Sequence, residues 1–195
     1  YASSMSVYGD ILDRGANEND TPSPKSFYGV GKVASENYLR IYSERGINCT
    51  SLRLCNIYGP GQNMQNSRQG MASIFIQQAL DQGHILVKGS KDRFRDFIYV
   101  DDVVNGFIEC AENNHFGYKC YNLTNNIKVT VENLINLISE AIGHDINVEY
   151  RGATPGDQFG VYGDNNRILE ETSWSPKVDL LGGMKKMITW AQSIK

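Results

Sequence analysis

The stretch SFYGVGKVASENYLRIYSERGINCTSLRL, residues 26–54, predicts a helix followed directly by a strand. Apolar side chains recur at helical spacing from Ser26 to Arg45, and Gly46 ends the pattern. Residues 47–54 form a run that favours a strand, and residues 1–4 have the character of an earlier strand that ends at Ser4. A strand, a helix and a strand in this order predict an α/β fold with a doubly wound parallel sheet.

The same alternation continues downstream. The sequence predicts helices over 71–82, 100–114, 131–142 and 180–195, and strands over 84–89, 94–100, 119–124 and 146–150. Asp101 or Asp102 is the expected N-cap of the second of these helices, and Thr130 opens the third. We expect two interleaved units, a sheet domain over 1–59 and 96–146 and a smaller lobe over 60–95 and 147–195.

Composition limits the classes of function. The chain has 195 residues, 41% hydrophobic and 21% charged, with a net charge of -3, which is typical of a globular domain that buries a core. No run of five like charges occurs, so neither nucleic acid nor an anionic membrane surface is an expected partner. No apolar run reaches the length of a membrane span and no signal peptide is evident, so we expect a cytoplasmic protein.

Cysteine and histidine residues give no sign of a metal centre. The four cysteines lack CxxC spacing and lie in apolar surroundings, as reduced core cysteines do. The three histidines are widely separated and form no HxxxH or HExxH pattern. The sequence therefore predicts no metal site.

Tyr28 and Lys32, in the run YGVGK, carry the chemistry of the first helix. Residues four apart share one helix face, so the phenol and the ammonium lie side by side. A fixed ammonium favours the phenolate, and such a pair can exchange a proton with a sugar or alcohol hydroxyl. Ser4, at the end of the preceding strand, is placed to donate a second hydrogen bond to the same oxygen. The spacing alone favours a packed ring beside a solvated amine, so this interpretation depends on further motifs.

Further motifs occur in a fixed order along the chain. They are SSMSVYGD (3–10), YGVGK (28–32), LRLCNIYGPGQ (52–62), RDFIYVDDVV (95–104), TPGDQ (154–158) and SWSPKVDLLGGMKKMITWA (173–191). Together they resemble the extended short-chain dehydrogenase/reductase family of NAD-dependent nucleotide-sugar epimerases and dehydratases, and most of all its UDP-hexose 4-epimerases. The resemblance covers nearly the whole chain. It implies the C-terminal part of a Rossmann-like NAD domain with an interleaved α/β substrate lobe.

The resemblance implies a role for each matching residue. Tyr28 would be the catalytic acid/base, Lys32 would hold the ribose of NAD, and Ser4 would bind the reacting sugar hydroxyl. The remaining expected cofactor contacts are Ser3, Leu54 and Cys55. The remaining expected contacts of the nucleotide-diphosphate sugar are Ser6, Asn56, Lys88, Arg95 and Asp157.

Several of these positions have simpler interpretations. Asn56 is also compatible with a turn residue, Arg95 with a surface ion pair, and Asp157 with a turn-shaping role. Lys88 stands where many relatives carry an aromatic side chain that stacks on the nucleotide base. These alternatives stay open at the level of sequence.

Relatives of this kind begin with a glycine-rich GxxGxxG turn for the NAD phosphates, and no such run occurs in these 195 residues. We therefore expect the sequence to be the later part of a longer protein. Relatives also dimerise through the YxxxK helix and the helix before it, which implies a homodimer for the full-length protein.

The residues after Ser4 bear on the reaction. Relatives that eliminate water place Asp and Glu there, because the elimination needs its own acid and base, whereas this chain has Met5 and Ser6. A 4-epimerase acting on a UDP-sugar is the favoured interpretation. A decarboxylase, a keto-sugar reductase, a dehydratase and a catalytically silent binding module are the alternatives.

Overall fold

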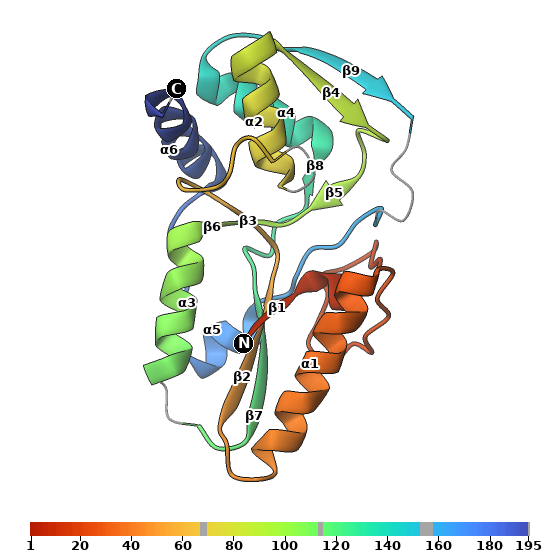
Figure 1. Cartoon of the computed structure of the whole chain (residues 1–195), viewed down its shortest axis with the longest axis vertical. Coiled ribbons are helices and arrows are strands. Elements are labelled where there is room, and N and C mark those ends of the chain that lie inside the picture. Colours follow the sequence, from red (N-terminus) through yellow and green to blue (C-terminus); the bar gives the residue numbers. More distant parts are fainter. Residues whose placement is uncertain (67–69, 113–114, 153–157, 195) are drawn as a thin grey trace.

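A parallel sheet of three strands, in the order β1-β2-β7, forms the lower half of the molecule (Figure 1). The structure, a computed structural model, describes residues 1–66, 70–112, 115–152 and 158–194. The strands are β1 (Ala2–Ser4), β2 (Cys49–Leu54) and β7 (Tyr118–Leu123). Ser4 lies opposite Leu54 and Leu54 opposite Leu123, so the carboxyl ends of the strands are aligned. This confirms the predicted parallel α/β sheet.

Helices cover both faces of this sheet (Figure 1). The helix α1 (Phe27–Ser43) packs against all three strands from one side, and α3 (Val100–Glu112) packs against β2 from the other. The face towards α3 is apolar and contributes Leu52, Tyr121 and Leu123 to a core. On α1, by contrast, Val30, Tyr38 and Ile41 are exposed, although they belong to its predicted apolar faces.

The upper half of the molecule (Figure 1) has its own core. In this core Leu134, Ile138 and Met184 are fully buried. Helices and a pair of parallel strands surround this core. These elements are α2 (Met71–Gln82), β4 (His84–Lys88), α4 (Val131–Ile142), β9 (Asn147–Arg151) and α6 (Leu180–Ser193). Thr130 caps α4 as predicted, because its side chain accepts a hydrogen bond from the Asn133 N–H.

Several short elements complete the two halves and the junction between them. They are η1 (Met5–Val7), β3 (Asn56–Tyr58), β5 (Phe94–Arg95), β6 (Phe97–Tyr99), β8 (Val129–Thr130) and α5 (Asn166–Glu171). The expected single strand over 94–100 is wrong, because the chain changes partners at Asp96. β5 pairs antiparallel with β8, whereas β6 pairs parallel with β3.

The packing differs from the expected division of the chain in two places. α4 lies within 96–146, which we assigned to the sheet domain, but its buried side chains belong to the upper core. Ile168 of α5 and Trp174 lie within 147–195, yet they pack in the core beside the sheet. The domain boundaries themselves stay a prediction.

No helix in the described ranges combines the length and apolar character needed to cross a bilayer. The four cysteines are free thiols, in line with the sequence.

The prediction that Asp101 or Asp102 caps α3 is wrong, because the helix begins at Val100 and both lie inside its first turn. The Asp102 carboxylate instead accepts hydrogen bonds from the backbone N–H groups of Lys177 (3.0 Å) and Val178 (3.1 Å). Asp102 is fully buried and thus ties α3 to the segment that leads into α6.

Replacing Asp102 by Ala is expected to lower the free energy of unfolding by about 3 kcal/mol, because two backbone N–H groups lose the buried carboxylate that accepts their hydrogen bonds. For a chain of this length the midpoint of thermal unfolding falls by roughly 6–12 °C. The matched control is Asp101→Ala, since Asp101 is exposed in the same turn. Equal midpoints for the two variants in a thermal unfolding experiment would contradict the assignment.

Candidate active site

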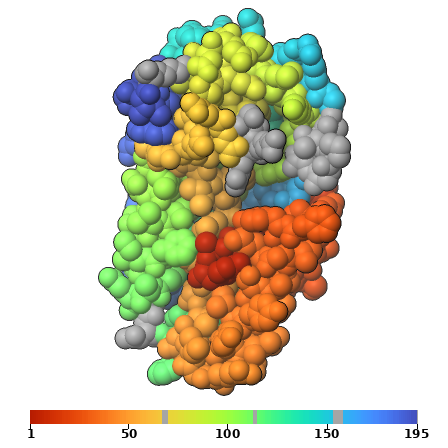
Figure 2. All heavy atoms as spheres, in the orientation of Figure 1, coloured from red at the N-terminus to blue at the C-terminus, as the bar shows by residue number. Residues whose placement is uncertain are grey.

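A cavity of about 810 Å³ opens at the carboxyl ends of β1 and β2. Ligands of open parallel sheets bind at this edge, because helix starts and loops converge there. Figure 2 shows the first residues of the chain, in red, at the surface between α3 and α1. The predicted site residues that line the cavity are Ser3, Ser4, Tyr28, Lys32, Leu54, Cys55 and Asn56.

Tyr28 enters the cavity because α1 begins close to β1. The Ser26 side chain caps the helix by accepting a hydrogen bond from the Gly29 N–H. A β-carbon on Gly29 would lie 2.6 Å from the Ser6 carbonyl oxygen, so the glycine permits this close approach. Tyr28 as a whole is 58% exposed, so it is accessible to a ligand.

Lys32 lies one turn further along α1 and faces the same cavity. Its Nζ donates a hydrogen bond to the Ala2 carbonyl oxygen at 2.8 Å and lies 5.2 Å from the centre of the Tyr28 ring. This contact uses one of the three hydrogen-bond donors of the ammonium group. The two residues predicted from their spacing are therefore neighbours, and the ammonium keeps donors for a ligand.

Ser4 ends β1 opposite this helix. Its hydroxyl oxygen accepts hydrogen bonds from the Ser6 N–H at 3.2 Å and from the Ser6 hydroxyl at 3.0 Å. Ser6 supports Ser4 in this way and does not itself line the cavity. The Ser3 hydroxyl points away, because it donates to Glu36, so Ser3 presents its backbone to the cavity.

Cys55 and Asn56 form the floor beside β2. Burial raises the pKa of the Cys55 thiol well above its usual range, and the nearby Asp96 carboxylate acts in the same direction. This raised pKa disfavours the thiolate form of Cys55. Asn56 donates through both its backbone N–H and its side-chain amide to the Asp96 carbonyl oxygen.

Three predicted substrate residues lie elsewhere or outside the description. The Arg95 guanidinium donates to the carbonyl oxygens of Phe94, Gln158 and Phe159, and Arg95 does not line the cavity. Lys88 is exposed at the end of β4 and does not line it either. Asp157 lies outside the described residues.

The far wall of the cavity comes from residues that the sequence did not single out: Ile57, Gln62, Asn66, Gly70, Met71, Ala72 and Phe97. The Gln62 side-chain oxygen is buried and receives no hydrogen bond from the described residues. One sequence feature could have predicted part of this wall. The run GPGQN directly follows a predicted strand, and this position places an amide side chain at the carboxyl edge of the sheet.

The comparisons with known proteins agree with this arrangement. Residues 1–124 match the family model described as "NAD dependent epimerase/dehydratase family". The chain belongs to this NAD-dependent family. A solved structure of MoeE5 in complex with UDP-glucuronic acid and NAD is 28% identical and superimposes with a TM-score of 0.91, over 100% of this chain and 64% of that chain. The fold is therefore Rossmann-like, and the cofactor of the family is NAD.

Curated relatives include more than one activity. A UDP-glucose 4-epimerase of Mycolicibacterium smegmatis is 29% identical over 188 residues, covering 96% of this chain and 59% of that protein. UDP-glucuronic acid decarboxylase 1 of Arabidopsis thaliana is 29% identical over 193 residues, covering 96% of this chain and 43% of that protein. The chain thus spans less than two thirds of the length of either relative.

The described residues fit part of a dinucleotide. Lys32 keeps donors for ribose hydroxyls, and Leu54 offers an apolar contact at the end of β2. No GxxGxxG turn for the phosphates occurs in this sequence, so these residues account for only part of a dinucleotide site.

Asp96 is expected to make the free energy of unfolding depend on pH. Burial raises the pKa of its carboxyl to about 7, although the Gly163 and Asn125 N–H groups donate to it and favour the ionised form. Between pH 4 and 7 the folded protein keeps this proton while the unfolded chain releases it. The free energy of unfolding therefore falls as the pH rises through this window and becomes level above about pH 7.

Asp96→Asn is expected to remove a pH dependence on the order of 4 kcal/mol, measured by chemical unfolding at pH 4 and pH 8. Asp92→Asn serves as the control, because Asp92 is an exposed neighbour. Parallel pH profiles for the wild type and Asp96→Asn would show that Asp96 ionises at its ordinary pKa.

Proposed function

We propose that the full-length protein is an NAD-dependent nucleotide-sugar 4-epimerase and that Tyr28 is its acid/base. The observation that carries the proposal is the presence of Tyr28, Lys32 and Ser4 on one cavity at the carboxyl edge of a parallel sheet. Two hydroxyls and an ammonium there suit a ligand with alcohol groups.

Each residue has a distinct part in this proposal. Tyr28 takes the proton of the sugar C4 hydroxyl and returns it at the end of the cycle. Lys32, whose Nζ lies 5.2 Å from the centre of the Tyr28 ring, donates to the ribose hydroxyls of the cofactor. Ser4 Oγ accepts two hydrogen bonds from Ser6, which leaves its own hydrogen to donate to the reacting sugar oxygen. NAD, when bound, supplies a reversible hydride acceptor.

The residues after Ser4 favour epimerisation over elimination. A dehydration needs an additional acid and base beside the sugar, but Met5 is buried and Ser6 is turned to Ser4. The similarity to a plant decarboxylase supports UDP-glucuronic acid decarboxylation as the second candidate. A keto-sugar reductase and a catalytically silent module are the remaining alternatives.

We also infer the partners. The substrate is a nucleotide-diphosphate sugar, and the UDP-sugars of the relatives make UDP the favoured nucleotide. Exposed apolar side chains on α1, among them Phe27 and Tyr42, favour a homodimer through this helix in the full-length protein. The site of action is the cytoplasm.

The proposal is tested by incubating the full-length protein with UDP-glucose or UDP-glucuronic acid and following the sugars by NMR. Conversion to the C4 epimer without net NADH formation or CO₂ release is expected. Tyr28→Phe should lower kcat about 10²- to 10⁴-fold, because the proton acceptor is lost.

Tyr38→Phe is the matched control, since Tyr38 is an exposed tyrosine on the same helix. CO₂ release would support the decarboxylase instead, and steady NADH consumption with a keto-sugar would support a reductase. An inactive protein that still binds UDP-sugar would be a silent module.

A further inference from the structure

The helix that carries Tyr28 and Lys32 is held to the sheet by a charge. The buried residues of α1 are Gly29 and Glu36 alone. Glu36 is 6% exposed, so it is the one side chain larger than hydrogen that this helix fully buries. An apolar stripe normally fixes a helix on a sheet, but in α1 the apolar side chain of Val33 is only partly buried and the buried side chain is a carboxylate.

Glu36 meets a matching cation on the sheet. Arg53, 5% exposed on β2, donates through Nε to Glu36 Oε1 at 2.9 Å and through Nη2 to Oε2 at 2.7 Å. The Ser3 hydroxyl of β1 donates to Glu36 Oε1 at 2.5 Å. A two-pronged contact of this kind fixes direction as well as distance, unlike contacts between apolar side chains.

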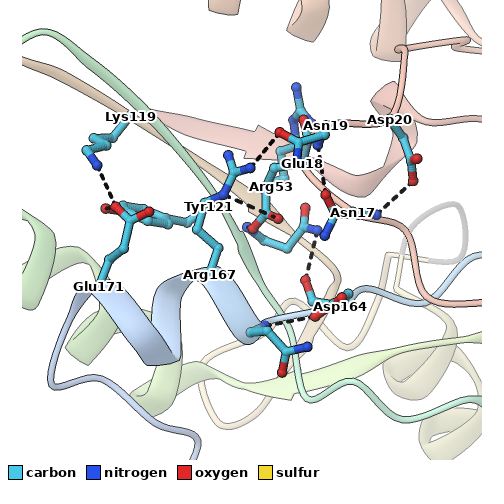
Figure 3. A network of polar contacts seen from close by, with 12 residues as sticks. Asn17, Glu18, Asn19, Asp20, Arg53, Lys119, Tyr121, Asp164, Arg167 and Glu171 are labelled. Carbon is cyan, nitrogen blue, oxygen red and sulfur yellow. Dashed lines mark hydrogen bonds and ion pairs between the residues drawn. The ribbon is translucent and has the colours of Figure 1, made fainter.

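Arg53 is itself held from several sides. Ser3, Arg53 and Asn122 are register partners on neighbouring strands, so they form a polar row across the sheet on the α1 side. The buried Tyr8 hydroxyl accepts from Arg53 Nη1 at 2.6 Å and donates to Asn122 Oδ1 at 2.7 Å. Figure 3 shows Arg53 beside the 17–20 segment, and its Nη1 also donates to the Glu18 carbonyl oxygen at 3.4 Å. The guanidinium is therefore a fixed point for α1.

Glu36 links the position of Arg53 to the positions of the side chains at the cavity. Tyr28, Lys32 and Glu36 are successive fourth residues of α1 and lie on adjoining parts of one helix face. Glu36 is about 12 Å along the axis from Tyr28, at 1.5 Å per residue. A rotation or slide of the helix at Glu36 would displace Lys32 from Ala2 and Tyr28 from the cavity opposite Ser4.

We propose that Glu36 is a positioning residue, whose bidentate contact with Arg53 sets the rotation and height of α1 and so places Tyr28 and Lys32 at the cavity. The proposal rests on the proposed function for the role of Tyr28, but its geometric part is measurable without turnover.

The test replaces the pair by apolar residues of similar volume, Glu36→Leu with Arg53→Met, in the full-length protein. Such exchanges of buried pairs often preserve stability, whereas removing one partner leaves a buried charge without compensation. We expect a folded double variant whose kcat falls about 10- to 100-fold while KM changes less than about 3-fold, because small misplacements of reacting groups slow chemistry more than binding.

The second readout is positional. Lys32 Nζ lies 5.1 Å from the centre of the Tyr1 ring, across the contact between α1 and β1. A nuclear Overhauser effect between the Lys32 ε-methylene and the Tyr1 ring is expected in the wild type and is expected to be lost in the double variant.

The matched control is Arg40→Gln with Glu44→Gln, which removes an exposed ion pair (3.9 Å) from the same helix. We expect it to keep both kcat and the Overhauser effect. Arg53→Lys is a milder variant, because it keeps the positive charge but loses the bidentate contact that the guanidinium makes. We expect its kcat to decrease a few-fold.

The proposal would be overturned by a folded double variant that keeps the wild-type kcat and the Overhauser effect. If the double variant does not fold, the same result for Arg53→Lys would overturn it. If the wild-type protein shows no epimerase activity, only the proposed function is contradicted. In that case loss of the Overhauser effect in the variant would still support the positioning role, and its retention would refute it.

Discussion

The buried contact between Arg53 and Glu36 is the constraint on which the lower half of the molecule depends. The face of the sheet towards α1 carries a row of polar side chains, among them Ser3 and Arg53. The side chain that α1 buries against this row is the carboxylate of Glu36. A buried charge requires a partner with good geometry, so the position of this helix is specified more sharply than packing alone would achieve. Because Tyr28 and Lys32 lie on the same helix, the contact also determines their positions at the cavity.

The cavity exists because two differently built halves meet at the carboxyl edge of the sheet. The lower half contributes the ends of β1 and β2 and the start of α1, and the upper half contributes the start of α2 and the loop before it. Asp96 joins them, since its carbonyl oxygen binds Asn56 and its carboxylate binds Asn125 and Gly163. The opposite wall combines the amide side chains of Gln62 and Asn66 with small and apolar residues, so it offers both polar and apolar contacts to a ligand.

Much of this architecture was accessible from sequence. Periodicity located α1, α2 and α4, and the YxxxK spacing with a serine at a strand end located the heart of the cavity. Asp102 was misassigned because a carboxylate at a helix start satisfies the capping pattern, whereas its partners, Lys177 and Val178, lie 75 and 76 residues away. Strands β5 and β6 were merged because their partners are set by tertiary contacts. Glu36 and Arg53 were missed, although a charged residue inside the strand run SLRL was a signal of a buried pair.

The most direct test of the account is a crystal structure of the full-length protein with NAD and a UDP-sugar bound. The account predicts that the Tyr28 hydroxyl and Ser4 Oγ both lie within about 2.6–3.2 Å of one sugar hydroxyl oxygen, with Lys32 at the cofactor ribose. It also predicts that the contact between Arg53 and Glu36 is unchanged in the complex. A sugar bound elsewhere, with Tyr28 free of contact to substrate and cofactor, would contradict the assignment of this cavity as the active site.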